Sequence, residues 1–188
     1  MHLTHLTPAN YKRMPWKNGG GTTTEVMVEP AGATERYDWR ISIADVAQSG
    51  PFSDFTGYNR TIMLIEGAGF VLDFDRGPTK RVDRPFEPFP FAGEWKADCT
   101  LIDGPVRDFN LIVARKGPKT SLDVVRLDRG TGAIAVAPTT IVHILAGSAW
   151  TQDRGLDVGD TLRLDETEHA IGITAVDPFV AAVIRIGR

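Results

Sequence analysis

Residues 60–74 read RTIMLIEGAGFVLDF, and residues 140–153 read the similar TIVHILAGSAWTQD. In both segments a glycine, Gly67 or Gly147, follows an apolar run and precedes a second short run. Short apolar runs separated by a glycine-containing turn are typical of β-strands. The offset between the two glycines is 80 residues. The repetition predicts that one β-unit occurs twice in the chain.

A second pair of segments supports this repeat. DFNLIVARKG begins at Asp108 and PFVAAVIRIG begins at Pro178, an offset of 70 residues. We expect an N-terminal half over residues 1–117 and a C-terminal half over residues 118–188, which together form a single compact protein. Residues 117–130 would supply a crossing strand and the linker between the halves. Chance similarity between β-rich segments is the alternative.

The rest of the chain also favours strands. Its 19 glycines and 12 prolines fall between short apolar runs, as in all-β barrels and sandwiches. One helix signal is present, Thr7-Pro8, an N-cap followed by proline, which predicts one or two turns ending before Pro15. We expect strands at Glu25–Glu29, Trp39–Ala44, Thr61–Ile65, Phe70–Phe74, Phe109–Ala114, Ile134–Val136, Ile141–Leu145, Thr161–Leu164, Ile171–Val176 and Val180–Ile186.

Composition excludes several classes of protein. The 188 residues are 42% hydrophobic and 24% charged, which is ordinary for a globular chain. The net charge is −3 and no basic run occurs, which argues against binding nucleic acid or a membrane surface. Apolar stretches are too short to span a bilayer, and the first residues lack the pattern of a secretory signal. We therefore expect a cytoplasmic protein.

Cysteine and histidine usage indicates no metal or redox site. The single cysteine, Cys99, cannot form an internal disulfide and is expected to be a small core residue. The four histidines form neither HxH nor HExxH, so we expect no metal and no cofactor. His143 lies inside an apolar run, where a core or lumen histidine is expected, with catalysis as the alternative.

Two segments could carry chemistry. MPWKNGGGTTTEV (residues 14–26) contains a tight-turn signal and three glycines that let the backbone approach a ligand or another strand closely. In DWRISIA (residues 38–44), alternation places Trp39 and Ile41 on one strand face and Arg40 and Ser42 on the other. Either Arg40 and Ser42 face solvent, or Arg40 enters a barrel lumen, where it must meet a carboxylate of the protein or of a ligand.

Further along, the loop GPFSDFTGYNR (residues 50–60) brings three aromatic residues and Arg60 to the entrance of a strand. The aromatic residues would form a hydrophobic plug. Arg60 is either an exposed edge charge or a second cation for an acidic ligand. Asp108 and Asn110 offer a carboxylate and an amide, which ordinarily serve turns and strand edges.

Taken together, PWKNGGGTTTEV, DWRISIADV, GPFSDFTGYNR with TIMLIEGAG, and DGPVRDFNLIVAR resemble the HutD/Ves family, over about residues 14–115. The resemblance implies a cupin-type fold, a double-stranded β-helix bicupin with two β-barrel halves and without metal-binding histidines. It also implies a role in histidine utilisation, as a regulator that senses a small carboxylate such as urocanate or N-formylglutamate.

The resemblance further implies a set of site residues. Cations would hold the ligand's carboxylates, neutral groups would add hydrogen bonds, and aromatic rings would cover its flat part. Glu25, Asp108 and Asn110 would support the site as built-in partners of the cations. The implied ligand-binding residues are Trp16, Lys17, Asn18, Gly19, Arg40, Ser42, Phe52, Phe55 and Arg60.

Two other functions stay open from the residues. A metal-independent isomerase or hydrolase could use Lys17, Glu25, His143 or Asp108 for general acid–base catalysis, although no nucleophile lies next to a base in the sequence. A protein-interaction module could instead use an outer sheet face to bind a partner or to form a homodimer. We expect a binding protein rather than an enzyme.

Overall fold

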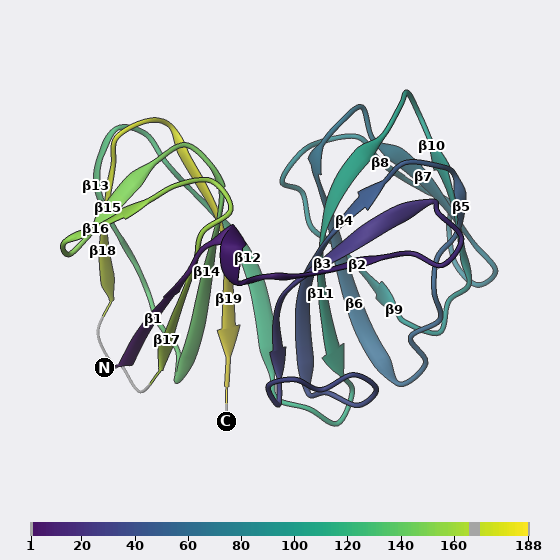
Figure 1. Ribbon diagram of the computed structural model, residues 1–188, viewed down its shortest axis with the longest axis horizontal. Helices are drawn as coiled ribbons and strands as arrows, with labels where there is room; N and C mark the ends of the chain where they lie inside the picture. Colours follow the sequence, from purple (N-terminus) through teal and green to yellow (C-terminus); the bar gives the residue numbers. More distant parts are fainter. Residues whose placement is uncertain (1, 166–169, 188) are drawn as a thin grey trace. The chain divides into compact units, whose positions relative to one another are not determined.

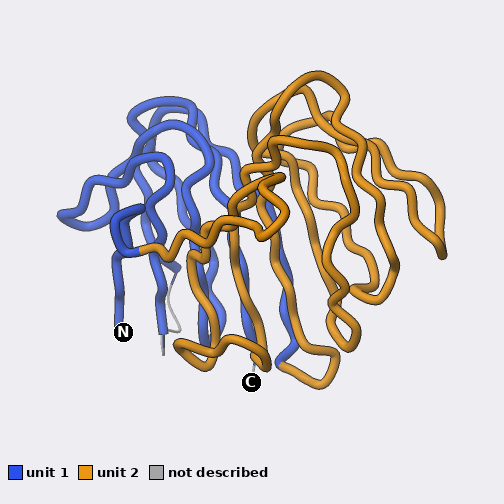
Figure 2. The backbone as a smooth tube through the Cα atoms, turned by 45° about the vertical axis from the view of Figure 1, so that its right-hand side comes forward, with its two compact units in different colours: residues 1–10, 118–188 blue, residues 11–117 orange. Residues whose placement is uncertain are grey.

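The computed structural model describes residues 2–165 and 170–187, and it is built almost entirely of β-strands (Figure 1). The chain divides into two compact units (Figure 2). Unit 2 runs from Tyr11 to Gly117, and unit 1 combines the chain up to Asn10 with the chain from Pro118 onward. No helix in the described part of the chain is long and apolar enough to cross a membrane.

Unit 2 contains two antiparallel sheets. The order is β2-β3-β4-β11-β6-β9 in the six-stranded sheet and β5-β10-β7-β8 in the four-stranded sheet. The bounds are β2 Lys12–Pro15, β3 Gly21–Glu29, β4 Trp39–Val46, β5 Gly50–Pro51, β6 Tyr58–Glu66, β7 Phe70–Phe74, β8 Lys80–Val82, β9 Phe89–Ala92, β10 Ala97–Leu101 and β11 Val106–Ala114.

The described part of unit 1 also contains two antiparallel sheets. The order is β1-β17-β14-β19-β12 in the five-stranded sheet and β13-β18-β15-β16 in the four-stranded sheet. The bounds are β1 His2–Leu6, β12 Thr120–Leu127, β13 Gly130–Ile134, β14 Thr139–Ala146, β15 Ala149–Thr151, β16 Arg154–Leu156, β17 Thr161–Asp165, β18 Ile171–Ala175 and β19 Phe179–Ile186.

The two units repeat one topology. The order β4-β11-β6-β9 in unit 2 matches β12-β19-β14-β17 in unit 1, and β5-β10-β7-β8 matches β13-β18-β15-β16. Each strand of unit 2 from β4 to β11 thus has a counterpart eight strands later. A repeated strand order of this kind is what the internal sequence similarity predicts.

One detail of the predicted repeat is wrong. Leu64 in unit 2 and Ile144 in unit 1 are equivalent positions, because they are separated by the same 80 residues as the two glycines. In the neighbouring strands, Asp108 pairs with Leu64 and Ala181 pairs with Ile144. Asp108 therefore corresponds to Ala181, an offset of 73 rather than 70. The two segments beginning at Asp108 and Pro178 are both apolar runs, so their composition alone does not set the register, and an odd shift exchanges the two strand faces.

Gly67 and Gly147 occupy the same turn in the two units. Their φ angles are +100° and +74°, which L side chains rarely adopt. A Cβ atom would lie 2.7 Å from the Pro105 carbonyl oxygen at Gly67 and 2.2 Å from the Pro178 carbonyl oxygen at Gly147. The backbone of the next long strand passes too close to both turns for any other residue.

We expect Gly147→Ala to lower the free energy of unfolding by about 2 kcal/mol, because it combines an unfavourable φ with a backbone clash. Urea denaturation followed by circular dichroism measures this. Gly172→Ala is the matched control, since a Cβ there meets nothing within 4 Å and φ is not left-handed. Equal midpoints for the two variants would contradict the close approach at Gly147.

A hydrophobic core fills each unit. In unit 2 it combines residues of both sheets, such as Ile62, Leu64, Phe70 and Leu72. Cys99 belongs to this core at 2% exposure, and burial raises the pKa of its thiol to about 12. Cys99 is thus a structural residue, as predicted. The core of unit 1 joins β14, β17 and β19 to the four-stranded sheet in the same way.

The predicted N-terminal helix is wrong. The chain forms only a single 3-10 turn over Pro8–Asn10, and β2 begins at Lys12. Asn10 Oδ1 accepts hydrogen bonds from the Thr7 N–H at 2.8 Å and from the Thr7 hydroxyl at 3.3 Å. The side chain therefore closes the turn locally, and the backbone leaves as a strand because it pairs with β3.

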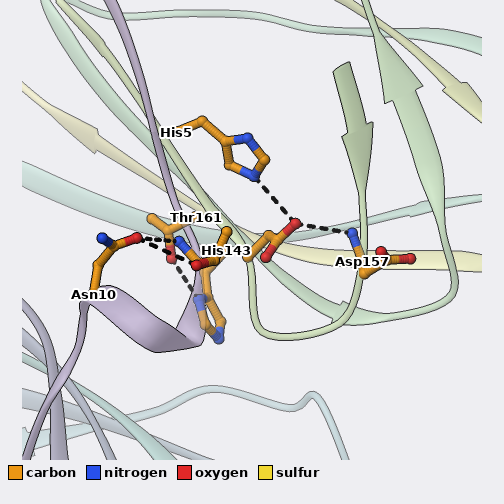
Figure 3. A network of polar contacts seen from close by, with 7 residues as sticks. His5, Asn10, His143, Asp157 and Thr161 are labelled. Carbon is orange, nitrogen blue, oxygen red and sulfur yellow. Dashed lines mark hydrogen bonds and ion pairs between the residues drawn. The ribbon is translucent and has the colours of Figure 1, made fainter.

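The two ends of the predicted halves also differ from the structure. The predicted N-terminal half includes the first residues of the chain, whereas β1 pairs with β17 of unit 1. His5 Nε2 lies 3.1 Å from Asp160 Oδ2, which also accepts the Asp157 N–H (Figure 3). Residues 117–130 do contain a strand, as predicted, but it is not part of a linker, because β12 belongs to unit 1 and pairs along its whole length with β19.

Candidate functional site

A cavity of about 550 Å³ lies within unit 2, a size typical of small-molecule sites. Buried residues on β4, β6 and β11 form its floor, and exposed residues of the β2–β3 turn and of the segment after β5 form its rim. The lining residues are Met14, Pro15, Trp16, Lys17, Asn18, Thr23, Arg40, Ser42, Ala44, Pro51, Phe52, Ser53, Phe55, Arg60, Asp108, Asn110 and Ile112.

Strand register brings the floor residues together. Ile112 on β11 lies between Arg60 on β6 and Arg40 on β4, and Asn110 pairs with Ser42 one step along the same face. Alternation then directs these side chains to one side of the sheet. Of the two environments predicted for Arg40, the lumen is confirmed. The opposite face of β4 is apolar and buried.

Arg60 is the buried cation of the floor. Its side chain donates from Nη2 to Asn110 Oδ1 at 2.9 Å. The guanidinium also lies over the rings of Phe52, Phe55 and Phe91, at 5.7, 4.7 and 4.9 Å from their centroids. Burial lowers the pKa of Arg60 to about 10, against the opposing attraction of Asp108. Arg60 therefore remains charged at neutral pH.

Asp108 is coupled to Arg60 through Asn110. The Asn110 amide donates to Asp108 Oδ1, and no direct ion pair joins the two charged groups in the described structure. Burial raises the pKa of Asp108 to about 7, which the charge of Arg60 and the Asn110 hydrogen bond oppose. Arg60 Nε and Asp108 Oδ2 are both buried without a hydrogen-bond partner. The polar groups of the floor are therefore not fully satisfied within the protein.

Arg40 has its own carboxylate partner. Its Nε donates to Glu25 Oε2 at 2.8 Å, and the two side chains are only 15% and 16% exposed. Glu25 lies opposite Ser42 in the register of β3 and β4 but does not itself line the cavity. Glu25 thus holds Arg40 in place at the cavity wall.

The glycine-rich turn shapes the rim. Gly19 has φ +71° and donates its N–H to the Trp16 carbonyl, and Gly20 donates to Asn18 Oδ1 at 3.0 Å. A Cβ on Gly21 would lie 2.5 Å from the Asp45 carbonyl oxygen and 3.0 Å from the Trp16 ring. Of the two roles considered for these glycines, Gly21 serves the close approach to another strand.

Most predicted site residues meet in this cavity. Two do not line it: Gly19 is part of the turn, because its backbone closes the β2–β3 connection, and Glu25 lies behind Arg40. The two-residue periodicity of a strand predicts Ala44 and Ile112 as well, since Ala44 lies on the same strand face as Ser42 and Ile112 on the same face as Asn110. Met14, Pro15, Thr23, Pro51 and Ser53 also line the cavity without having been predicted.

His143 is separate from the cavity. It lies on β14 of unit 1, 1% exposed, with Nδ1 2.8 Å from the Thr161 hydroxyl (Figure 3). The cavity itself is lined by three cations and a single carboxylate, a donor set that does not fit a divalent metal. Nowhere in residues 2–165 and 170–187 do three His, Cys, Asp or Glu side chains gather as metal ligands would.

Comparison with known proteins identifies the family. The HutD family model matches residues 8–178. A 21.2 kDa protein encoded in the hutC 3′ region of Pseudomonas putida is 35% identical over 183 residues, which cover 94% of each chain. A protein from Pseudomonas aeruginosa PAO1 has a TM-score of 0.88 at 32% identity over the whole of both chains. HutD from Pseudomonas fluorescens SBW25, solved in a formate condition, has a TM-score of 0.81 at 33% identity, covering 98% of this chain and 99% of that one.

More distant structures share the fold alone. YhhW from Escherichia coli, a bacterial pirin, has a TM-score of 0.75 at 8% identity, covering 97% of both chains. Oxalate decarboxylase from Lactobacillus farciminis has a TM-score of 0.72 at 8% identity, covering 96% of this chain and 85% of that chain. The all-β, cupin-type prediction is confirmed. With the model match extending over both units, the chain belongs to the HutD family.

Proposed function

We propose that this protein is a metal-free, cytoplasmic receptor for a small carboxylate metabolite and that it regulates histidine utilisation. The observation that carries the proposal is Arg60, a cation at the buried floor of a 550 Å³ cavity whose Nε has no partner within the protein. A guanidinium is the side chain best suited to gripping a carboxylate at two points.

The rest of the cavity suits such a ligand. Arg40 and Lys17 add positive charge to its lining, Ser42 and Asn18 can donate hydrogen bonds, and the Phe55 ring offers an apolar wall. The gene position of the Pseudomonas putida relative next to hutC supports a place in histidine utilisation. Urocanate and N-formylglutamate, two acids of that catabolism, are the ligands we propose.

The proposal is tested by thermal shift and calorimetric titration with urocanate, N-formylglutamate, glutamate, histidine and formate. A ligand at about 100 times its Kd stabilises the folded state by about 2.7 kcal/mol, or roughly 5–11 °C in Tm for a protein of this size. We expect a saturable shift with one of the two proposed acids. No shift with any of the five compounds would overturn the proposed function.

We expect Arg40→Gln to weaken acid binding by about tenfold, because a charge-assisted contact contributes on the order of 1–2 kcal/mol. Isothermal titration calorimetry measures the change in Kd. Arg115→Gln is the matched control, since Arg115 also pairs with a glutamate, Glu94, but does not line the cavity. An unchanged Kd in Arg40→Gln would place the ligand away from β4.

An enzyme remains the second candidate, because Asp108, with a pKa of about 7, lies in the same cavity as Lys17 and is suited to proton transfer at neutral pH. Incubation of urocanate or N-formylglutamate with a hundredth as much protein, followed by chromatography, distinguishes the two functions. Product in excess of protein indicates catalysis, whereas a receptor returns the acid unchanged.

A further inference from the structure

We propose that Asp108 takes up a proton when an acid binds at Arg60, so that the pocket binds the acid and the proton together. This inference rests on the proposed function, since it requires a carboxylate at Arg60. It concerns the arrangement Arg60–Asn110–Asp108, in which the neutral amide of Asn110 separates a buried cation from a buried carboxyl group.

The geometry of this arrangement places Asn110 between the two charged groups. Asn110 accepts from Arg60 through Oδ1 and donates to Asp108 through Nδ2, so that the amide orientation is set from both sides. Asp108 is 1% exposed, and its Oδ2 receives no hydrogen bond. A buried carboxylate with one satisfied oxygen is held in its charged form mainly by the nearby cation.

Binding of an acid would change the charge balance of the cavity floor. In the empty pocket, the charge of Arg60 favours the ionised form of Asp108. When a ligand carboxylate pairs with Arg60, the ligand offsets that charge and adds a negative charge of its own on the floor. Both changes disfavour the ionised form of Asp108, because two carboxylates in one buried site repel each other and raise the free energy of the ionised state. When Asp108 is neutral, the ligand carboxylate no longer competes with it for the positive charge of Arg60.

The titratable neighbours of Asp108 are the alternative sites for the proton. Three titratable side chains interact electrostatically with Asp108, namely Arg60 on β6, Asp45 on β4 and Cys99 on β10. Arg60 stays protonated at neutral pH, with a pKa of about 10, and so does Cys99, whose pKa burial raises to about 12. Asp45 lies at the surface, where Arg107 Nε is 2.9 Å from its Oδ1.

Two further cations line the cavity. Arg40 is paired with Glu25, and Lys17 is exposed at the rim. The Tyr37 hydroxyl interacts electrostatically with Arg40 and Arg60. Burial raises the pKa of this hydroxyl, so Tyr37 stays neutral. Asp108 is therefore the group whose protonation changes near neutrality when the pocket fills.

The expected result follows from linkage. Because the bound form holds one more proton than the empty form, affinity for the acid falls as pH rises above about 7, with a limiting slope of tenfold per pH unit. Asp108→Asn is neutral at every pH, and its Kd should equal the low-pH Kd of the wild type without varying with pH. Asp103→Asn, a change in the exposed turn before β11, should retain the wild-type pH profile.

The experiment is isothermal titration calorimetry of the full chain in buffers of different ionisation enthalpy. The probes are formate and N-formyl-L-glutamate, which are fully ionised between about pH 5.5 and 8.5, and urocanate above about pH 7, where its ring is neutral. The slope of the observed binding enthalpy against the ionisation enthalpy of the buffer gives the number of protons taken up per ligand bound. This count is made on the wild-type protein, so it does not depend on any variant folding.

A count approaching one proton taken up near pH 8, and lost in Asp108→Asn, supports the proposal. Binding without proton exchange, or with proton release, overturns it and leaves the proposed receptor function intact. If none of the three acids binds, the receptor function itself fails, and this inference with it.

Discussion

Arg60→Met weakens acid binding by at least about 30-fold, the largest effect on affinity that we expect from one substitution. The variant removes a buried charge that the ligand's carboxylate would otherwise meet at two points, and losing one partner of such a pair costs about 2–5 kcal/mol. The unbranched apolar side chain of methionine can occupy the space between the Phe52, Phe55 and Phe91 rings. Calorimetric titration of the variant measures the loss.

Two further variants make this result specific. Arg84→Met removes an arginine whose side chain is 78% exposed and which does not line the cavity, so its Kd should match that of the wild type. Arg60→Lys keeps the charge without the planar two-point grip and should recover only part of the affinity. Wild-type affinity in Arg60→Met, with cooperative unfolding retained, would mean that the acid binds elsewhere.

Asp108→Asn becomes more stable relative to the wild type as pH rises, by about 4 kcal/mol between about pH 4 and pH 8. The pKa of Asp108 is about 7 in the folded protein, against 3.8 for an unperturbed aspartate. Between these values the folded wild type holds a proton that the unfolded chain has released. Its stability therefore falls as pH rises through this window, whereas asparagine has no proton to lose.

Urea denaturation of both proteins at several pH values measures this difference. Comparing the variant with the wild type at each pH removes the contribution of every other titrating group. Asp103→Asn, at an exposed position, should differ from the wild type by the same amount at all pH values. A difference for Asp108→Asn that is independent of pH would mean that the Asp108 carboxyl titrates in its ordinary range.

Much of the fold was predictable because each longer strand appears in the sequence as a short apolar run bounded by turn residues. The apolar runs around Gly67 and Gly147 form β6 and β7 and, in unit 1, β14 and β15, and each glycine turn carries the chain from one sheet to the other. The bounds of β7 are those predicted. Short edge strands such as β5 and β16 were not predicted, because two or three residues carry too little periodicity. The helix expected after Thr7 was wrong because strand pairing outweighs a local cap.

The site was predicted less completely, because its members come from distant strands. Resemblance to the family indicated Lys17, Arg40 and Arg60 as cations of one pocket, and all three line the cavity. The relation between Asp108 and Arg60 depends on Asn110 meeting a residue 50 positions earlier in the chain. Contacts of that kind follow from register, which alternation along one strand does not define.

A comparison of the two units shows which features depend on local sequence and which depend on tertiary structure. The sequence by itself determined the strand class, the glycine turns and the duplication, because backbone preferences and apolar alternation act over a few residues. Only tertiary structure decided that unit 2 has a charged floor. The register places Asp108 at the position that Ala181 occupies in unit 1, and burial there, which no local pattern encodes, brings its carboxyl group near neutrality.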